Sequence, residues 1–310
     1  MRIIRDYQFI DPQDRGATVA IGNFDGVHIG HQSVIDLARA ANPDAPLGVM
    51  TFEPHPRAYF APEAPHFRLM SREARSSRLE KLGMDRLYEL NFNTAMASLT
   101  PREFAQSVIA DGLGLAHVVV GADFCFGKDR AGTTHDLAAF GKEMGFGVTI
   151  APLLAANTDT VSSTAIRKAL TDGHPEIAAE MLGHWHRIEG QVIGGEQRGR
   201  ELGYPTANMS VDGLHLPALG VYAVIFDVLD GPHAGTYHGA ASLGVRPMFG
   251  ENKPNIETFV FDFSGDLYDA QASVALVAYL RGEENFDSLE TLITQMNADC
   301  TQAREILEAL

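Results

Sequence analysis

The residues between Ala17 and Ala41 constrain the fold of this chain more than any other stretch. An apolar run ends at Ile21, glycines follow at positions 22, 26 and 30, and from His31 onward apolar residues recur at helical spacing. A buried strand, a glycine-rich turn and a helix in this order are typical of a parallel α/β sheet. Glycines let the backbone approach a ligand closely, and the N–H groups at a helix start face any anion bound there. We therefore expect this turn to bind phosphate.

Two histidines, His28 and His31, lie within the turn. The turn has neither the Gly-Lys-Ser/Thr ending of a P-loop nor the Gly-x-Gly-x-x-Gly spacing of dinucleotide folds. Two imidazoles at a helix N-terminus could donate hydrogen bonds to an α-phosphate whose charge grows as pyrophosphate leaves, which favours nucleotidyl transfer. A chance pair, or a pair that binds a metal, is an equal alternative on these two residues alone.

Polar residues also follow two further apolar runs. His55 follows a run that ends at Phe52, and Asp123 follows a run that ends at Gly121. Because open α/β sheets bind ligands at the carboxyl ends of their strands, we expect both side chains at that edge. A proline-rich surface turn is the alternative for His55. Phe124 and its neighbour at 126 could flank a planar ring, although one of them should belong to the core.

The segment from Arg68 to Leu82 is rich in arginine and predicts a solvated helix. Thr100 begins a capping box with Glu103, and the helix that follows should be buried. The residues that we expect this helix to bury are Phe104, Ala105, Val108 and Ile109.

Beyond residue 183 the pattern changes, and we place a domain boundary there, between residues 1–183 and 184–310. Short β-type runs without intervening helices indicate an antiparallel barrel or sandwich. These runs are Arg187–Ile193, Val221–Leu229, Tyr237–Leu243, Ile256–Phe263 and Ala272–Leu280. The last helix carries an apolar stripe that we interpret as core. The stripe consists of Leu289, Leu292, Ile293 and Met296.

The segment from Gly190 to Asn208 is the second dense motif. A glycine-rich connection with two arginines could wrap a polyphosphate, but a mobile surface loop explains the same composition. Thr206 and Asn208 at its end supply neutral oxygens, which suit Mg²⁺ if phosphate oxygens complete the octahedral shell.

The composition limits the partners of the chain. Its 310 residues exceed what one core usually serves, and the net charge of −16 argues against a nucleic-acid partner because no basic face is visible. Two cysteines are too few for a disulfide framework, and neither has metal-type neighbours. Since the chain has no signal-like segment and no 18-residue apolar run, we expect a cytoplasmic protein without a membrane partner.

Gly22 to His31 resembles the HxGH signature of nucleotidylyltransferases, in the GxFDGVHxGHQ form of prokaryotic bifunctional riboflavin kinase/FAD synthetases. The segments at 51–56, 120–127 and 162–167 are similar to the family's TFxPHP, VGxDFxFG and SSTxIR motifs. Residues 190–208 match every specified position of its riboflavin kinase signature, GxVxxGxxxGRxLGxPTAN. The resemblance runs from about Val19 to about Asp299.

The resemblance implies an α/β N-terminal nucleotidylyltransferase domain with a Rossmann-like parallel sheet and a C-terminal antiparallel β-barrel riboflavin kinase domain. It implies that riboflavin and ATP give FMN, that FMN and a second ATP give FAD and pyrophosphate, and that both steps need Mg²⁺. His28, His31, Arg167 and Glu257 would be catalytic, and Thr206 and Asn208 would hold the metal. The expected binding residues are Gly22, Asn23, Phe24, Asp25, Gly30, His55, Asp123, Ser163, Thr164, Gly195, Arg200, Gly203, Pro205 and Arg246. A serine at 162 or 163 could instead serve only as an N-cap.

Three positions depart from the family pattern. Phe259 stands where histidine is usual, Asp269 replaces a glycine, and Met248 lies in a segment that has lost a threonine. These changes put the local geometry of the kinase domain in doubt. Two alternatives therefore stay open: a flavin- or nucleotide-binding regulatory protein, and an adenylyltransferase with an inactive kinase domain. Weak homo-oligomerisation is also left open.

Overall fold

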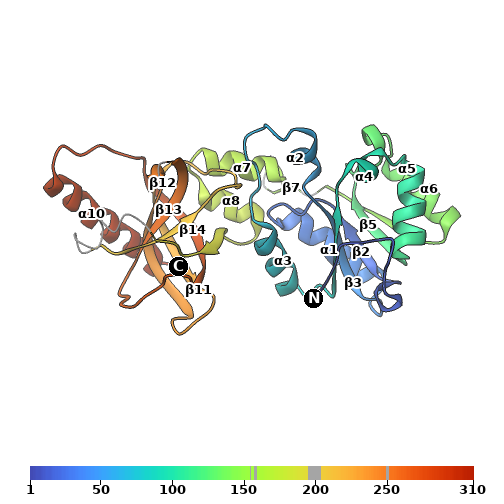
Figure 1. Ribbon diagram of the computed structural model, residues 1–310, viewed down its shortest axis with the longest axis horizontal. Coiled ribbons are helices and arrows are strands. Elements are labelled where there is room, and N and C mark those ends of the chain that lie inside the picture. Colours follow the sequence, from blue (N-terminus) through green and yellow to red (C-terminus); the bar gives the residue numbers. More distant parts are fainter. Residues whose placement is uncertain (154, 157–158, 195–203, 249–250) are drawn as a thin grey trace. The chain divides into compact units, whose positions relative to one another are not determined.

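The computed structural model describes residues 1–153, 155–156, 159–194, 204–248 and 251–310, with backbone alone at 155–156, 159–160, 246–248 and 251–253. By contacts the chain divides into two compact units (Figure 1). The first unit comprises Met1–Pro65 and Arg72–Ser162, and the second comprises His66–Ser71 and Ser163–Leu310. Helices α7 (Ser163–Thr171) and α8 (Pro175–Leu182) thus group with the second unit. The functional boundary after residue 183 stays a prediction.

The first unit is built on a six-stranded parallel sheet, which confirms the α/β prediction. Its strand order is β1-β4-β3-β2-β5-β6, and every adjacent pair runs parallel. Strand β2 is buried along its whole length, as expected for a central parallel strand covered on both faces. The strands are β1 (Arg2–Ile4), β2 (Thr18–Ile21), β3 (Leu47–Glu53), β4 (Arg86–Asn91), β5 (His117–Gly121) and β6 (Gly147–Ala151). A two-stranded ribbon, β7 (Ala155–Ala156) and β8 (Asp159–Thr160), follows.

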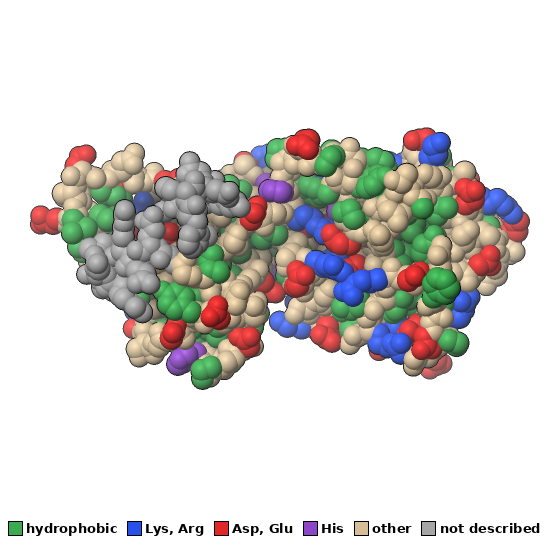
Figure 2. Space-filling view, in the orientation of Figure 1, with side chains coloured by type: hydrophobic (Ala, Val, Ile, Leu, Met, Phe, Trp, Pro, Cys, Tyr) green, Lys and Arg blue, Asp and Glu red, His purple; other side chains and the backbone are tan. Residues whose placement is uncertain are grey.

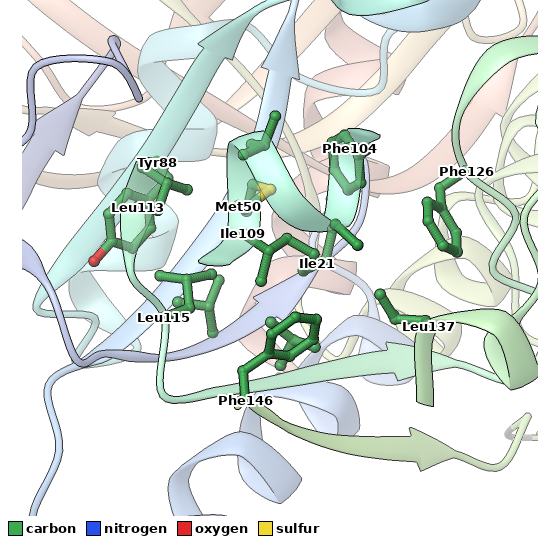
Figure 3. Packing of buried hydrophobic residues seen from close by; sticks show 14 of the residues in the cluster. Ile21, Met50, Tyr88, Phe104, Ile109, Leu113, Leu115, Phe126, Leu137 and Phe146 are labelled. Atoms are coloured by element: carbon green, nitrogen blue, oxygen red, sulfur yellow. The ribbon is translucent and has the colours of Figure 1, made fainter. Parts of the chain in front are cut away.

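Helices cover both faces of this sheet. Helix α1 packs on β2, β3, β5 and β6, while η2 and α6 contribute to the apolar cluster on the other face. Figure 3 shows Ile109 of η2 and Leu137 of α6 in that cluster with Ile21 and Met50 of the sheet. The helices are η1 (Pro12–Asp14), α1 (Ile29–Ala41), α2 (Pro56–Phe60), α3 (Arg72–Lys81), α4 (Thr94–Ser98), α5 (Pro101–Glu103), η2 (Phe104–Leu113), η3 (Lys128–Arg130) and α6 (Thr134–Met144).

The two helix predictions in this unit have different outcomes. The capping box at Thr100 is present, and all four residues expected to be buried after it are buried in η2. The helix predicted in the arginine-rich segment is present as α3, but the expectation that it is solvated is wrong for one face, because Arg75 is only 2% exposed. Its guanidinium contacts Glu53 at 3.1 Å and Glu89 at 3.0 Å, so paired carboxylates offset the cost of burying it.

The second unit contains a six-stranded antiparallel sheet that curls as a barrel does. The strand order is β10-β13-β12-β11-β14-β9, and a bridge between Ile193 and Asn208 joins the chain after β9 to β10. Alternate side chains fill the interior, among them Tyr222, Val224 and Phe226. The strands are β9 (His186–Gln191), β10 (Thr206–Ser210), β11 (Gly220–Val228), β12 (Gly235–Met248), β13 (Glu251–Val260) and β14 (Gln271–Arg281). All five predicted strand runs are present, and β10 is an addition to them.

Helix α10 (Leu289–Glu308) packs on the outer face of this sheet through Ala303 and Leu307, which meet Phe261 and two alanines of the sheet. The apolar stripe predicted as core lies in the first half of the helix and is not fully buried: Leu289 is 55% exposed, and Leu292, Ile293 and Met296 are half-buried. Burial therefore follows the C-terminal half of the helix, where it lies against the sheet.

The distribution of charged side chains on the surface and the length of the helices indicate which partners and membranes the chain could meet. On the face shown in Figure 2, acidic side chains are spread over both units, whereas most of the basic side chains lie over the first unit. Within the described ranges, no helix is both long enough and apolar enough to cross a membrane.

Candidate functional site

The sheet of the first unit has a topological switch point between β2 and β5. From β2 the chain runs through α1 to β3 on one side, whereas β5 and β6 lie on the other side. Open α/β sheets bind ligands at such a point, outside the carboxyl ends of the strands. The turn that carries Gly22, Asn23, Phe24, Asp25 and Gly30 follows β2, and the segment with Asp123 follows β5.

His28 and His31 stack on each other at the start of α1. Their ring centroids are 3.6 Å apart with planes inclined by 17°. His28 is the N-cap, and its Nδ1 accepts a hydrogen bond from the backbone N–H of His31 at 3.2 Å. Because Nδ1 is an acceptor, the proton of a neutral His28 ring lies on Nε2, where it can be donated to a ligand.

His31 is held as a neutral imidazole. Burial among its neighbours, together with the charge of His28, lowers the pKa of His31 well below its usual range. Its Nδ1 is buried and has no hydrogen-bond partner among the residues that the structure describes, which also favours placing the proton on Nε2. His31 therefore offers a neutral N–H donor rather than positive charge.

The turn before α1 is fixed by its own contacts. Phe24 and Val27 adopt left-handed backbone with φ of 52° and 43°, conformations that bulky and β-branched residues seldom adopt. The Phe24 ring is buried, and Thr51 Oγ1 donates to the carbonyl of Asn23 at 3.1 Å. An ideal Cβ on Gly30 would lie 3.0 Å from His28 Nδ1, so glycine there leaves room for the ring.

His55 and Asp123 lie where the strand-end argument predicts, after β3 and β5. His55 caps α2, and its Nδ1 accepts from the backbone N–H of Arg57 at 3.0 Å, which again leaves Nε2 as the donor. Asp123 is exposed. Phe126 belongs to the core and stacks on the half-buried Phe124 at 5.6 Å, so one of the two phenylalanines is core as expected.

An aromatic group beside His55 was missed by the sequence reasoning. Phe60 is 68% exposed, and its ring centroid lies 5.1 Å from that of Tyr59 and 5.8 Å from that of Phe92. The adjacent residues Tyr59 and Phe60, which closely follow Pro54-His55-Pro56, were the sequence signal from which this group could have been predicted. They give the first unit an accessible surface suited to a planar ring.

Ser163, Thr164 and Arg167 lie in the first turns of α7, in the second unit. Arg167 Nη1 donates to the carbonyl of Phe67 at 3.2 Å, and its guanidinium carbon lies 5.8 Å from the centre of the Phe67 ring. The contact of Arg167 with Thr164 Oγ1 is 3.4 Å. That these three residues join the paired histidines around one ligand stays a prediction.

The second candidate site lies on the outer face of the barrel-like sheet. Thr206 and Asn208 of β10 stand opposite Phe259 and Glu257 of β13. Directly opposite residues have Cβ atoms about 5 Å apart, so Asn208 and Glu257 are neighbours. The alternate residue Ala207 belongs to the interior cluster, which places the four on the other face.

Hydrogen bonds orient the polar groups of this site. Asn208 Nδ2 donates to the backbone carbonyl of Thr206 at 3.2 Å and to its Oγ1 at 3.4 Å, which leaves the Asn208 Oδ1 as an acceptor. Asn255 Nδ2 donates to Glu257 Oε1 at 3.2 Å, and Asn255 is only 4% exposed. Asn255 was missed, although its i, i+2 spacing from Glu257 on a strand was the available signal.

The oxygens of Thr206 and Asn208 fit a hard divalent ion that takes its remaining ligands from phosphate and water. No cluster of three or more His, Cys, Asp or Glu side chains suited to a metal occurs among the described residues. Gly195, Arg200 and Gly203 lie outside those residues, and Arg246 is described by its backbone in β12 alone. Pro205 is exposed directly before β10.

Two departures from the family pattern have local explanations. Asp269 adopts φ of 65°, a left-handed conformation that aspartate tolerates better than most residues, so the glycine-like turn is kept. The Phe259 ring packs edge-on against Tyr204 at 5.0 Å and against Phe261 at 5.8 Å. Neither substitution interrupts the pairing of β10 with β13.

Comparisons with known proteins cover the whole chain. The FAD synthetase family model matches residues 10–165, and the riboflavin kinase family model matches residues 182–307. Both families generally use a divalent metal ion. A crystal structure named as a macrolide-efflux protein from Streptococcus pneumoniae has a TM-score of 0.83 at 31% identity over 96% of each chain, which supports the fold.

Relatives from two bacteria carry one and the same name, bifunctional riboflavin kinase/FMN adenylyltransferase. The protein from Pseudomonas fluorescens is 40% identical over 99% of this chain and 98% of its own length. That from Listeria monocytogenes is 35% identical over 96% of this chain and 94% of its own length. With both family models matched in order along its length, this chain belongs to the bifunctional riboflavin kinase/FMN adenylyltransferase family.

Proposed function

We propose that the second unit phosphorylates riboflavin with ATP to give FMN, and that the first unit transfers AMP from a second ATP to FMN to give FAD. The observation that carries this proposal is the presence of two separate sites, each with groups suited to one of the reactions. The paired histidines lie in one compact unit, and the cross-strand pair of Asn208 and Glu257 lies in the other.

In the kinase reaction the terminal ribityl hydroxyl attacks the γ-phosphorus of ATP. Glu257 accepts the hydroxyl proton, and the bond from the γ-phosphorus to the bridging oxygen breaks to release ADP. Asn255 holds the Glu257 carboxylate through its amide. Thr206 and Asn208 would hold Mg²⁺ with the ATP phosphates, and the ion would neutralise charge as the phosphoryl group moves. Gly195, Arg200, Gly203, Pro205 and Arg246 complete the proposed nucleotide and flavin contacts.

In the adenylylation a phosphate oxygen of FMN attacks the α-phosphorus of ATP. The bond between the α-phosphorus and the oxygen that bridges it to the β-phosphorus breaks, which releases pyrophosphate. No covalent intermediate with the protein forms. The Nε2–H groups of His28 and His31 donate to the α-phosphate as its charge grows, which is preorganised electrostatic stabilisation. Ser163, Thr164 and Arg167 bind the β- and γ-phosphates, with Arg167 stabilising the departing pyrophosphate.

The remaining substrate groups have matching surfaces in the first unit. Asp123 accepts from the nucleoside, and His55 binds beside the phosphates. The exposed aromatic group of Tyr59, Phe60 and Phe92 suits the planar isoalloxazine ring of FMN, since a flat apolar ring is best covered by other rings. We further propose a cytoplasmic protein with no nucleic-acid partner and at most weak homo-oligomerisation.

One assay separates this function from its two alternatives. The purified chain is incubated with ATP, Mg²⁺ and either riboflavin or FMN, and the flavins are resolved by chromatography. Conversion of riboflavin to FMN and then FAD supports both activities. Absence of any product would indicate a binding protein, and conversion of FMN without conversion of riboflavin would indicate an adenylyltransferase whose kinase domain is inactive.

A further inference from the structure

We infer that Tyr204 is a positioning residue for riboflavin phosphorylation, because it ties the start of β10 to helix α10. This inference rests on the proposed kinase function of Thr206, Asn208 and Glu257. Tyr204 touches neither substrate nor metal in this assignment. It acts by fixing the backbone from which Thr206 projects.

Tyr204 is held from two sides. Its hydroxyl donates to Asn297 Oδ1 of α10 at 2.6 Å, and its ring meets the Phe259 ring edge-on at 5.0 Å with planes inclined by 64°. Burial beside the helix, with Cys300 close by, raises the pKa of the Tyr204 hydroxyl. The Tyr204 hydroxyl therefore stays protonated at neutral pH and can donate its hydrogen bond.

The position of Tyr204 affects the position of the proposed metal-binding residues, Thr206 and Asn208. Tyr204 precedes Thr206 by two residues, and Phe259, on which the tyrosine ring packs, is the strand partner of Thr206. Asn208 Nδ2 in turn donates to both the carbonyl and the hydroxyl of Thr206. A shift at Tyr204 would move both oxygens of Thr206 and would leave the Asn208 amide without its orienting contacts.

Helix α10 is a firm support for this contact. Asp299, two residues after Asn297, is 5% exposed and receives two hydrogen bonds from Arg281 Nε, at 3.0 and 3.1 Å, and one from Arg281 Nη2 at 2.8 Å. Gln295 donates to the same carboxylate at 2.9 Å. The helix is thus anchored to the end of β14, close in sequence to the residue that holds Tyr204.

The residue at 259 fits this arrangement. The family resemblance favours histidine there, and this chain has phenylalanine. A phenyl ring offers an apolar surface to the edge of Tyr204 and has no ring nitrogen that would compete with Asn297 for the tyrosine hydroxyl. Phe259, which departs from the family pattern, is therefore part of the Tyr204 contact that we infer orders Thr206 and Asn208.

The test is Tyr204→Phe in the full chain, which removes one hydroxyl and keeps the ring. A neutral hydrogen bond contributes a factor of about five to the equilibrium that it supports, so the KM for ATP in riboflavin phosphorylation should rise about fivefold. The KM for riboflavin and the melting temperature should change little, and FMN adenylylation should be unchanged. Tyr237→Phe is the matched control, because Tyr237 loses a similar bond, to the His233 carbonyl at 3.0 Å, away from β10.

Asn297→Ala removes the acceptor of the same hydrogen bond, and Asn297 lies at an exposed position on the helix. This variant should show the same rise in the KM for ATP. In the double variant the two effects should not add, since each removes the same interaction. An unchanged KM for ATP in both single variants would overturn the inference, as would an equal rise in Tyr237→Phe. If the unaltered chain does not phosphorylate riboflavin at all, the kinase proposal fails and this inference fails with it, which is a distinct result.

Discussion

Gly30→Ala is the substitution that tests the paired-histidine site most sharply. The added Cβ would lie 3.0 Å from His28 Nδ1 and 3.1 Å from Cε1, whereas atoms in ordinary contact are 3.4 Å or more apart. The His28 ring must therefore shift by a few tenths of an ångström, which disturbs its stacking on His31 and its cap to the His31 N–H. The His28 side chain is only 7% exposed, so it has little space into which to turn.

The effects on stability nearly cancel, whereas the effect on catalysis does not. Weakening the cap costs up to about 1 kcal/mol, and replacing glycine by alanine inside α1 returns up to ~1 kcal/mol of helix propensity. Removing one preorganised donor to a developing charge costs roughly 3 kcal/mol, or about a hundredfold in kcat. We expect FMN adenylylation to fall about a hundredfold, while riboflavin phosphorylation and the melting temperature stay close to those of the unaltered chain.

A companion variant separates the donor from the cap. His28→Asn keeps a side-chain oxygen that can cap α1 but lacks the distant N–H, so it should lose adenylylation as strongly as Gly30→Ala. Gly235→Ala is the control, because its Cβ would meet only Tyr237 at an ordinary 3.7 Å. If Gly30→Ala retains adenylylation within about threefold of the unaltered chain, the orientation of the His28 ring does not matter and the reasoning is wrong.

Four further predictions follow from the two sites. Asn208→Ala should abolish riboflavin phosphorylation and spare adenylylation, as product chromatography would reveal. Asn255→Ala should lower the kcat of phosphorylation about tenfold with little change in the KM for ATP, because it removes one hydrogen bond that orients the Glu257 carboxylate and does not touch Thr206 or Asn208. Removal of divalent ions by a chelator should stop both reactions, and added Mg²⁺ should restore them. Burial, with the charges of His184 and His215, lowers the pKa of His186 to about 3. Below pH 6.5 the unfolded chain therefore binds a proton that the folded chain does not, so the free energy of unfolding should fall by about 1.4 kcal/mol per pH unit on acidification. Denaturant titrations at pH 7 and 5 should show a smaller fall for His186→Gln, and an equal fall would exclude His186 as the cause.

The sequence predicted best those elements that are ordered by local pattern. Strand β5 ends at Gly121, where the apolar run predicted an end, and the capping box at Thr100 formed as expected. These features depend on neighbours within a few residues. The strand-end positions of His55 and Asp123 were also foreseeable, because a parallel sheet brings its carboxyl ends together.

Features that depend on partners far along the chain were not foreseeable. The burial of Arg75 requires Glu89, which lies on a strand fourteen residues later, and Asn255 matters because β13 turns it toward Glu257 beside β10. The stripe that begins at Leu289 has helical spacing but lies at the end of α10 that the sheet does not cover. Periodicity identifies an apolar face, whereas burial requires a second surface opposite it.

Both sites must bind a polyanion on a chain with a net charge of −16, so the net charge of the chain does not favour binding and the groups at each site must do so. The groups that the structure provides act at short range instead. A neutral imidazole, that of His31, lies at the start of α1 in one unit, and the neutral oxygens of Thr206 and Asn208 lie in the other. Short-range donors of this kind discriminate by geometry, because a hydrogen bond weakens steeply when its angle or length departs from the optimum. For that reason a displacement of a few tenths of an ångström, such as an added Cβ at Gly30 imposes, should reduce the rate far more than it reduces the stability of the fold.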